Sequence, residues 1–383
     1  MFTPLNQVDL AGLANDTRIY CQPACFVERP HGLDGRVARV GDGMLWFAAW
    51  QFIVRDDAGA VREALVPVAE IADCIAALPS DVAMRATAQI AAVSAPRPAL
   101  VMGARTIRLA EPQIMGILNI TPDSVSGDGI YGDADRAAAV GVDMAAAGAA
   151  IIDVGGESTR PGAKLVWEGD EIERVVPVIE RLARADVAVS IDSRKAGVME
   201  AALAAGASMI NDVGALAYDD RAISVAAKAG CPVVLMHAPS QSSDPHDMSK
   251  MRGGANADAA LDVFDWLADR IEAVVAGGIK RENIIVDPGI GFGKGVSDNL
   301  RIINALPLFH ALGCPLLFGA SRKRLIGAVD NEAEAKGRLG GSLALAQQAV
   351  MAGAQLHRVH DVAQTRQVFK VWRAGRDAAL TRA

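Results

Sequence analysis

Eight short apolar segments follow one another through the last two thirds of the chain, and nearly every one ends in polar or ionisable residues. They cover residues 114–119, 151–153, 187–192, 208–212, 232–237, 283–287, 315–321 and 355–360. A parallel strand that is buried on both faces has this kind of continuous aliphatic and β-branched sequence. The polar residues mark where each strand leaves the core, so eight such ends predict one functional rim.

Stretches with helical spacing separate these segments, at 133–148, 168–185, 195–205, 221–230, 255–277, 297–313 and 336–353. Several end at a glycine that is followed at once by the next strand, as at Gly148, Gly206 and Gly353. This alternation predicts an α/β protein with a (β/α)8 TIM barrel. An open doubly wound sheet is the alternative, and it is disfavoured because such a sheet concentrates its site at one switch point.

The first 98 residues lack this alternation and predict a smaller α+β extension ahead of a barrel at 99–383. The elements expected in it are one or two strands at 43–56, one or two helices interrupted by Pro79 at 68–93, and a linker at 94–98. Residues 99–112 predict a hairpin that plugs the amino-terminal mouth of the barrel. Because the extension has no catalytic constellation, a supporting or dimer-contact role is favoured over a second activity.

The net charge of −7 argues against a general binder of nucleic acid or membrane surfaces. Five cysteines do not suggest a disulfide framework, and the Cys21/Cys25 pair has no second pair to complete a metal site. No apolar run reaches the ~18 residues of a membrane span, and no basic amino end precedes an apolar stretch. We therefore expect a cytoplasmic protein without nucleic-acid or membrane partners.

Seven motifs at successive predicted strand ends carry the chemistry of the chain. They are Gly116–Ser124 (GILNITPDS), Asp153–Ala163 (DVGGESTRPGA), Ser190–Asp192, Ile210–Asp212, Asp287–Lys294 (DPGIGFGK), Ser321–Lys323 and Arg358–Asp361 (RVHD). In this order they resemble the dihydropteroate synthase family over residues 99–383. The resemblance implies a transferase of folate biosynthesis, a sulfonamide target that condenses 6-hydroxymethyl-7,8-dihydropterin diphosphate with p-aminobenzoate. It also implies a cytoplasmic homodimer that uses Mg2+.

A dihydropterin presents an amino-pyrimidine edge with N–H donors beside ring acceptors. Reading that edge requires carboxylate acceptors and an amide that both donates and accepts. Asp192, Asn211 and Asp287 supply this set from three strand ends. The resemblance adds Lys323, which would donate to the pterin carbonyl and ring nitrogen, and places Phe292 and Arg358 in the pterin site as well.

The diphosphate requires concentrated positive charge in an acidic protein. Arg358 and His360 alternate along the last strand and therefore point to one side, whereas His357 faces the other way and is interpreted as structural. Asn119 ends the first strand, which neighbours the last one in a closed barrel. The resemblance implies that Arg358 and His360 hold the diphosphate and that Asn119 binds the Mg2+ bridged to it.

The remaining assignments concern catalysis and p-aminobenzoate. The resemblance implies that Thr159 contacts the diphosphate and that Arg160 orders a closed state, which makes both catalytic together with Arg358, His360 and Lys323. The p-aminobenzoate site would comprise Thr159, Arg160, Pro161, Ser321 and Arg322. Ser321 is expected to open a helical turn whose N–H groups hold the carboxylate. Residues 120–131 form the other loop over the site.

The implied reaction is dissociative: pyrophosphate leaves first, and the neutral aniline nitrogen then attacks the exocyclic methylene cation. No general base is required. This agrees with the absence of a Ser/His/Asp or Cys/His arrangement among the motifs.

The chain departs from the family pattern in two places. Val125 stands where most relatives have a phenylalanine that packs on the p-aminobenzoate ring, and Gly127-Asp128 exchanges the next two residues. The smaller side chain predicts binding of p-aminobenzoate and sulfonamides weaker by about 1 kcal/mol, which Val125→Phe should restore. After the fifth strand, Ala238 replaces a methionine of the pterin pocket, and the lone His237 is interpreted as structural.

Two other functions compete with the synthase. A pterin-dependent methyltransferase shares the barrel and the pterin readers, but it has no reason to keep Arg358, His360 and the Ser-Thr-Arg-Pro loop. A catalytically silent pterin-binding regulator is conceivable because of the altered first loop. Release of pyrophosphate separates the synthase from the regulator.

Overall fold

The computed structural model describes residues 3–4, 13–56, 61–121, 130–160, 162–240, 246 and 258–381. Its largest sheet has eight parallel strands in the order β13-β12-β11-β10-β9-β8-β15-β14. They are β8 (Gln113–Asn119), β9 (Ile151–Gly155), β10 (Val189–Asp192), β11 (Met209–Asp212), β12 (Val233–Met236), β13 (Ile284–Asp287), β14 (Leu317–Phe318) and β15 (Leu356–Val359). Each falls within or overlaps one of the predicted segments.

The two ends of this sheet meet. A parallel bridge joins Val286 of β13 to Leu316, and the Val286 N–H donates to the Pro315 carbonyl at 2.9 Å. The sheet is thereby closed, which confirms the predicted TIM barrel and excludes the open doubly wound alternative. Because every strand runs in the same direction, all carboxyl ends lie at one mouth.

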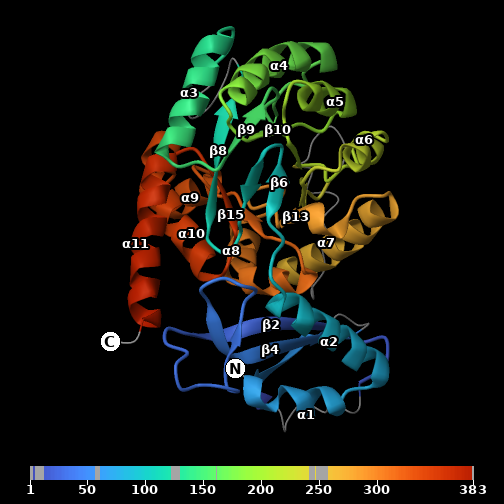
Figure 1. The fold of residues 1–383 in the computed structure, drawn as a ribbon. Helices are drawn as coiled ribbons and strands as arrows, with labels where there is room; N and C mark the ends of the chain where they lie inside the picture. The colour runs from blue at the N-terminus through green and yellow to red at the C-terminus, as the bar shows by residue number, and fades with distance from the viewer. Residues whose placement is uncertain are drawn as a thin grey trace.

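Helices surround the barrel (Figure 1). They are α3 (Ala134–Ala147), α4 (Glu168–Arg184), α5 (Ala196–Ala204), α6 (Ala222–Ala229), α7 (Ala259–Ala276), α8 (Val296–Asn304), α9 (Arg324–Val329), α10 (Leu339–Met351) and α11 (Val362–Leu380). Gly148 has a φ of +116° at the end of α3, as the helix-stop interpretation predicts. The helix expected over 297–313 is divided, because Pro307 has no N–H to continue it and a 3₁₀ helix (Leu306–Leu312) follows.

A hairpin closes the other mouth of the barrel. Its strands are β6 (Leu100–Met102) and β7 (Arg105–Ile107), which pair antiparallel. Leu100 and Ile107 are buried in one cluster with inward side chains of the barrel. These inward side chains are Met115, Ile151, Ala188, Met209, Val234, Ile285, Leu317 and Leu356. The predicted plug is confirmed, and it leaves the carboxyl-end mouth for a ligand.

The N-terminal part forms its own sheet, in the order β1-β5-β4-β2 with β3 paired to β4. The elements are β1 (Thr3–Pro4), β2 (Arg18–Val27), β3 (Ala38–Arg39), β4 (Trp46–Arg55), β5 (Val61–Pro67), α1 (Ile71–Ala76) and α2 (Ser80–Ser94). The helices separate at Pro79, as predicted. The sequence interpretation found β4 but missed β2 and β5.

Specific contacts attach this part to the barrel (Figure 1). Arg97 lies in the segment expected to be a linker, yet it is buried and donates to the His310 carbonyl at 3.0 Å. Tyr20 packs edge-on against Phe264 of α7, with ring centres 5.5 Å apart. Segment 94–98 is therefore a fixed contact rather than a free linker.

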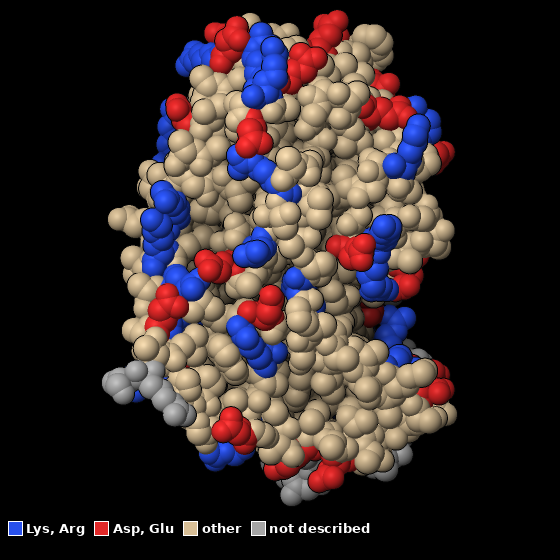
Figure 2. Space-filling model, in the orientation of Figure 1, with Lys and Arg blue, Asp and Glu red and all other residues tan. Residues whose placement is uncertain are grey.

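Acidic and basic side chains are interspersed over the face in Figure 2, and neither kind forms a broad field there. Among the described helices, none is both long and apolar enough to cross a membrane. All five cysteines lie in the described part, and each is a free thiol.

Candidate active site

Four strand ends meet in one hydrogen-bonded network at the carboxyl mouth. Arg358 of β15 donates through Nε to Asp153 Oδ2 at 2.6 Å and through Nη2 to Asp192 Oδ2 at 2.7 Å. Asn211 of β11 donates through Nδ2 to the same Asp153 oxygen at 2.9 Å. Because Asp153 takes the NH2 end of Asn211, the amide oxygen remains for a ligand. The structure thus brings together three predicted site residues and adds Asp153, which the sequence interpretation did not assign to the site.

A second set of predicted residues lies around the glycine-rich turn after β13, with Asp287 at the end of that strand and Lys323 reaching the turn from beyond β14. Asp287 accepts from the Gly289 N–H at 2.7 Å. The Lys323 ammonium donates to the Ile290 carbonyl and lies 4.6 Å from the ring centre of Phe292. Gly289 has a φ of +69°, and a Cβ there would lie 1.9 Å from the His237 carbonyl oxygen. Only glycine fits this close approach.

Burial governs the charge of these residues. It raises the pKa of the Asp192 carboxyl to about 7, although the Arg358 guanidinium opposes the shift. It raises the pKa of Asp287 in the same way, against Lys323. Burial also lowers the pKa of the Lys323 ammonium to about 8, while Asp287 favours its charged form. The mouth therefore combines one acceptor, Asp192, and one cation, Lys323, whose pKa values lie near neutral pH.

The β14 and β15 ends differ from expectation in two respects. Ser321 does not open a helix, because α9 begins only at Arg324. Its hydroxyl oxygen instead lies 3.1 Å from His360 Nδ1 and accepts a hydrogen bond from the backbone N–H of His360 at 3.2 Å. Burial, with repulsion from Arg358 and Arg322, lowers the pKa of His360 to about 3. His360 therefore offers a neutral N–H donor rather than the expected positive charge.

Arg322 is held by Asp361 through two hydrogen bonds, of 2.9 and 2.5 Å. The serine, histidine and arginine assigned to p-aminobenzoate and diphosphate thus lie on adjoining strand ends. His357 is fully buried beside Phe369, with ring centres 4.6 Å apart. This confirms its structural interpretation.

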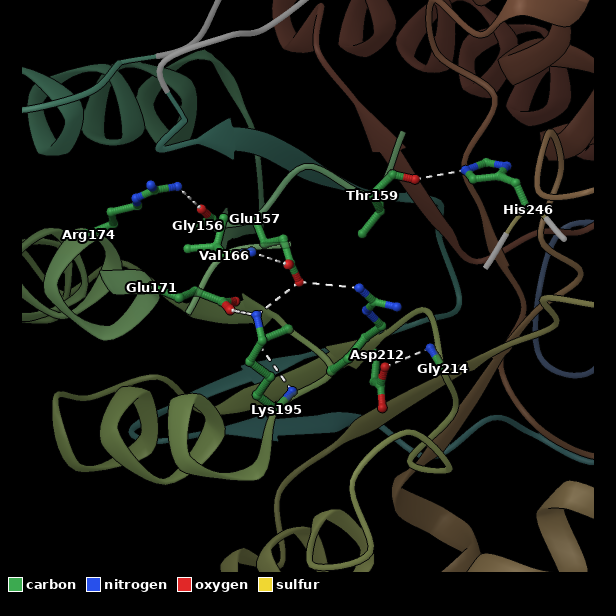
Figure 3. Close-up of polar contacts among 12 residues, drawn as sticks. Gly156, Glu157, Thr159, Val166, Glu171, Arg174, Lys195, Asp212, Gly214 and His246 are labelled. Carbon is green, nitrogen blue, oxygen red and sulfur yellow. Dashed lines mark hydrogen bonds and ion pairs between the residues drawn. The ribbon is translucent and has the colours of Figure 1, made fainter. Parts of the chain in front are cut away.

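The loop that carries Thr159 and Arg160 is tied at its base by a buried ionic cluster (Figure 3). Glu157 accepts from the Val166 N–H at 2.8 Å and from the Lys195 ammonium at 3.0 Å. Lys195 also donates to Glu171 of α4 at 2.6 Å, and Arg194 reaches Glu157 at 3.3 Å. One carboxylate therefore joins both ends of the loop.

The pKa values of the two carboxyls in this cluster are shifted in opposite directions. The Val166 N–H and the Lys195 ammonium lower the pKa of Glu157 below its usual range, against the effect of burial. Burial raises the pKa of Glu171, which Lys195 opposes. The sequence interpretation missed Glu157 and Lys195. Their only signal was their position just beyond two strand ends, where a helix cap or a surface ion pair is equally common.

The structure describes only some of the other residues that the sequence singled out. Asn119 is half-buried at the end of β8. Within the described part of the chain, its side chain makes no hydrogen bond to the other site residues named in this section. Pro161, Val125, Gly127 and Asp128 lie outside the described residues. His237 is buried edge-on against Trp266 and its pKa is far below the usual value because of burial, which supports its structural interpretation.

The fold and this mouth define a class of protein: a (β/α)8 barrel whose strand ends gather carboxylates, an amide and cations at one mouth. The model of the family described as pterin binding enzyme matches residues 115–360. The dihydropteroate synthase of Haemophilus influenzae is 43% identical over 275 residues, which cover 72% of this chain and 98% of that protein.

Solved structures agree. The Xanthomonas albilineans dihydropteroate synthase with 4-aminobenzoic acid is 42% identical, with a TM-score of 0.66 over 73% of this chain and 98% of that one. The Yersinia pestis dihydropteroate synthase in a sulfonamide complex is 41% identical, with a TM-score of 0.68 over 73% and 99%. This chain belongs to the pterin-binding enzymes, and among them to the dihydropteroate synthase family. The match leaves more than a quarter of this chain outside it.

Proposed function

We propose that this chain condenses 6-hydroxymethyl-7,8-dihydropterin diphosphate with p-aminobenzoate, giving 7,8-dihydropteroate and pyrophosphate. The observation that carries the proposal is the network at the mouth, where Asp153 orients both Arg358 and Asn211 and where Arg358 meets Asp192. Asp287 and Lys323 supply the remaining acceptor and donor. A relative with the same barrel was crystallised with 4-aminobenzoic acid, which supports the second substrate.

In this proposal, Asp192, Asn211 and Asp287 accept from and donate to the amino-pyrimidine edge, and Phe292 lies beside the ring. Lys323 donates to the pterin carbonyl and ring nitrogen. Arg358 and the neutral N–H of His360 hold the diphosphate, with Thr159 and Arg160 above it. Ser321, Arg322 and Pro161 belong to the p-aminobenzoate side.

The reaction breaks the bond between the exocyclic methylene carbon and the diphosphate oxygen, and the electron pair leaves with pyrophosphate. The dihydropterin ring stabilises the carbon that remains, and the amine nitrogen of p-aminobenzoate then forms the new bond and loses a proton. The protein holds the two reactants in line and keeps water from the cation. Because the attacking amine is neutral, no side chain has to remove a proton first.

Magnesium is part of the proposal through Asn119. An amide oxygen is a suitable hard ligand, and Mg2+ is commonly bound through few protein ligands together with substrate phosphates. Among the described residues, no group of three or more His, Cys, Asp or Glu side chains could hold a metal ion alone. Asn119, at the end of β8 beside β15, would supply one amide ligand to an ion that arrives with the diphosphate, and the ion would neutralise the charge of the leaving group.

Pyrophosphate release from the full chain tests the proposal. Release is expected only when the pterin diphosphate, p-aminobenzoate and Mg2+ are all present, and 7,8-dihydropteroate should appear in equal amount. Omission of each component is the control. If the chain binds the pterin but releases no pyrophosphate, the regulator described above replaces the synthase.

We further propose a homodimer, a cytoplasmic location and a boundary near residue 98 between an added N-terminal unit and the barrel. The free thiols favour a reducing compartment. The boundary is supported by the change at residue 100, where the hairpin that closes the barrel begins. Light scattering on the full chain measures the oligomeric state, and a monomer would contradict the proposed homodimer.

A further inference from the structure

A histidine from outside the predicted motifs contacts both the Thr159 loop and the glycine-rich turn after β13. His246 lies on the connection between β12 and α7, far in sequence from the Thr159 loop. Its ring stacks on Phe292, with ring centres 4.8 Å apart and planes 11° from parallel. Its Nε2 lies 2.7 Å from the Thr159 carbonyl oxygen, as Figure 3 shows.

The contacts define which nitrogen of His246 carries the proton. The Gly293 N–H points to Nδ1 at 3.4 Å, so Nδ1 acts as an acceptor. Nε2 then carries the hydrogen and donates to the Thr159 carbonyl. The imidazole thus joins the main chain of the Thr159 loop to the glycine-rich turn.

The same connection approaches the glycine-rich turn closely at a second point. A Cβ at Gly293 would lie 2.2 Å from Pro239 Cγ and 3.3 Å from the His246 carbonyl oxygen. Phe292, next to Gly293, also has the Lys323 ammonium 4.6 Å from its ring centre. His246 therefore meets the turn where an aromatic ring and a cation already define one wall of the site.

We propose that His246 is a positioning residue that ties the Thr159 loop to the Phe292 wall and so shapes the p-aminobenzoate half of the site. The inference rests on the proposed function, because Thr159 and Phe292 are its substrate residues. A loop held in place before binding loses less freedom when the ligand arrives, so the tie strengthens binding without touching the reacting atoms. The pterin-reading edge at Asp192, Asn211 and Asp287 does not depend on it.

Three substitutions distinguish the hydrogen bond to the Thr159 carbonyl from the stacking on Phe292. His246→Ala removes both contacts, His246→Phe keeps a ring for stacking on Phe292, and His246→Gln keeps an N–H that can reach the Thr159 carbonyl. The control is His31→Phe, because His31 Nε2 also lies 2.7 Å from a carbonyl oxygen, that of Leu380, but on the exposed N-terminal part. Thermal unfolding identifies any variant that has lost its fold.

Steady-state pyrophosphate release provides KM for each substrate and kcat, and calorimetry provides the Kd of the bare pterin. In His246→Ala and His246→Phe, KM for p-aminobenzoate should rise about tenfold, the effect of one lost hydrogen bond, with the pterin Kd within about twofold of wild type. His246→Gln should recover most of the loss, and His31→Phe should match the wild type.

An unchanged KM in folded His246→Ala would overturn the proposal. Recovery in His246→Phe but not in His246→Gln would also overturn it, because ring packing rather than the tie would then be responsible. Should the wild type itself release no pyrophosphate, the proposed function fails separately. The tie is then measured by calorimetric binding of p-aminobenzoate to the pterin-loaded variants, with the same pattern expected.

Discussion

Asp153 has the most consequential single contact in the site, since one of its oxygens accepts from both Arg358 and Asn211. It comes from β9, whereas its partners come from β15 and β11. A carboxylate in this place fixes the direction of the guanidinium and of the amide before a ligand binds. In the proposed function, the pterin edge would therefore be read by side chains whose orientation Asp153 sets.

The raised pKa of Asp192 predicts how pterin binding depends on pH. The pterin N–H donors require the ionised carboxylate, which forms as the pH rises through about 7. The pterin Kd should therefore be about tenfold weaker at pH 6 than at pH 8. Calorimetry at both pH values measures this, with Asp192→Asn as the control that removes the dependence. A wild-type Kd equal at both values would contradict the assigned role.

The same shift has the opposite sign for stability. Asp192 holds its proton in the folded state at pH values where the unfolded chain has lost it, because its pKa rises from 3.8 to about 7. Its contribution to the free energy of unfolding therefore decreases as the pH rises through this window. Ionisation of Asp192 is therefore expected to strengthen pterin binding and to lower the free energy of unfolding.

The sequence could predict most residues of the mouth but not their partners. Asp192, Asn211 and Asp287 were recognisable because each ends an apolar segment. The role of Asp153 was not, since its partner Arg358 lies 205 residues away and no local pattern joins them. His246 carries no local signal either, because it lies in a polar stretch between two elements.

At the level of elements, the ionic cluster beneath the Thr159 loop yields a prediction. Glu157→Gln leaves Lys195 and Arg194 with less negative charge in a buried place, so the free energy of unfolding should fall by about 3 kcal/mol. KM for p-aminobenzoate should rise with it, because the loop loses its anchor. Urea unfolding and pyrophosphate release measure the two effects.

The matched control is Glu168→Gln, which removes one partner of the exposed Glu168–Arg221 pair at 3.9 Å. An exposed pair of this kind contributes at most about 1 kcal/mol. If Glu157→Gln unfolds no more easily than Glu168→Gln, the cluster does not hold the loop.

The glycine-rich turn gives a second prediction at this scale. Gly289→Ala forces a Cβ toward the His237 carbonyl oxygen and places alanine at a φ of +69°. We expect a loss of about 3 kcal/mol in the free energy of unfolding, from backbone strain and overpacking together. Pterin binding should weaken too, because the Gly289 N–H supports Asp287. Urea unfolding and calorimetry measure the two losses.

Gly340→Ala is the comparison, since a Cβ at Gly340, in α10, meets nothing within 4 Å. Alanine there should be neutral or stabilising by about 1 kcal/mol. If the two variants have equal free energies of unfolding, the turn accommodates a side chain at Gly289 without strain.

The elements of the barrel were predictable because each strand is buried on both faces and reads as one apolar segment. The strands of the N-terminal sheet were harder. β2 contains Pro23 and exposed positions at or near both ends, and in β5 the polar residues Arg62 and Glu63 follow the first residue, Val61. Their partners are other strands of the same sheet, which a local pattern does not reveal.

Across the whole molecule, the N-terminal part is joined to α7 by buried and half-buried contacts. Arg55 of β4 donates to Asp262 at 2.7 Å, and their side chains are only 14% and 16% exposed. Arg55→Ala should lower the free energy of unfolding by about 2 kcal/mol, because it leaves a shielded carboxylate without its cation. kcat should not change, since neither residue belongs to the hydrogen-bonded network at the carboxyl mouth. Urea unfolding and pyrophosphate release test both statements.

Arg105→Ala serves as the control, because the Arg105–Asp186 pair is 48% and 77% exposed. If Arg55→Ala is as stable as this control, the N-terminal part is only loosely attached. A chain that starts at Ala99 would also expose Phe264, which Tyr20 now covers. We therefore expect that truncation costs stability rather than chemistry.

The central claim is that the carboxyl ends of β9, β10, β11, β13 and β15 read a pterin. A crystal structure of the full chain with 7,8-dihydropteroate measures this most directly. We expect the amino-pyrimidine edge within hydrogen-bonding distance of Asp192, Asn211 and Asp287, with the p-aminobenzoate moiety toward Ser321 and the Thr159 loop. Clear density for the ligand at any other place, such as the pocket lined by Arg18, Tyr20 and Phe264, would contradict it.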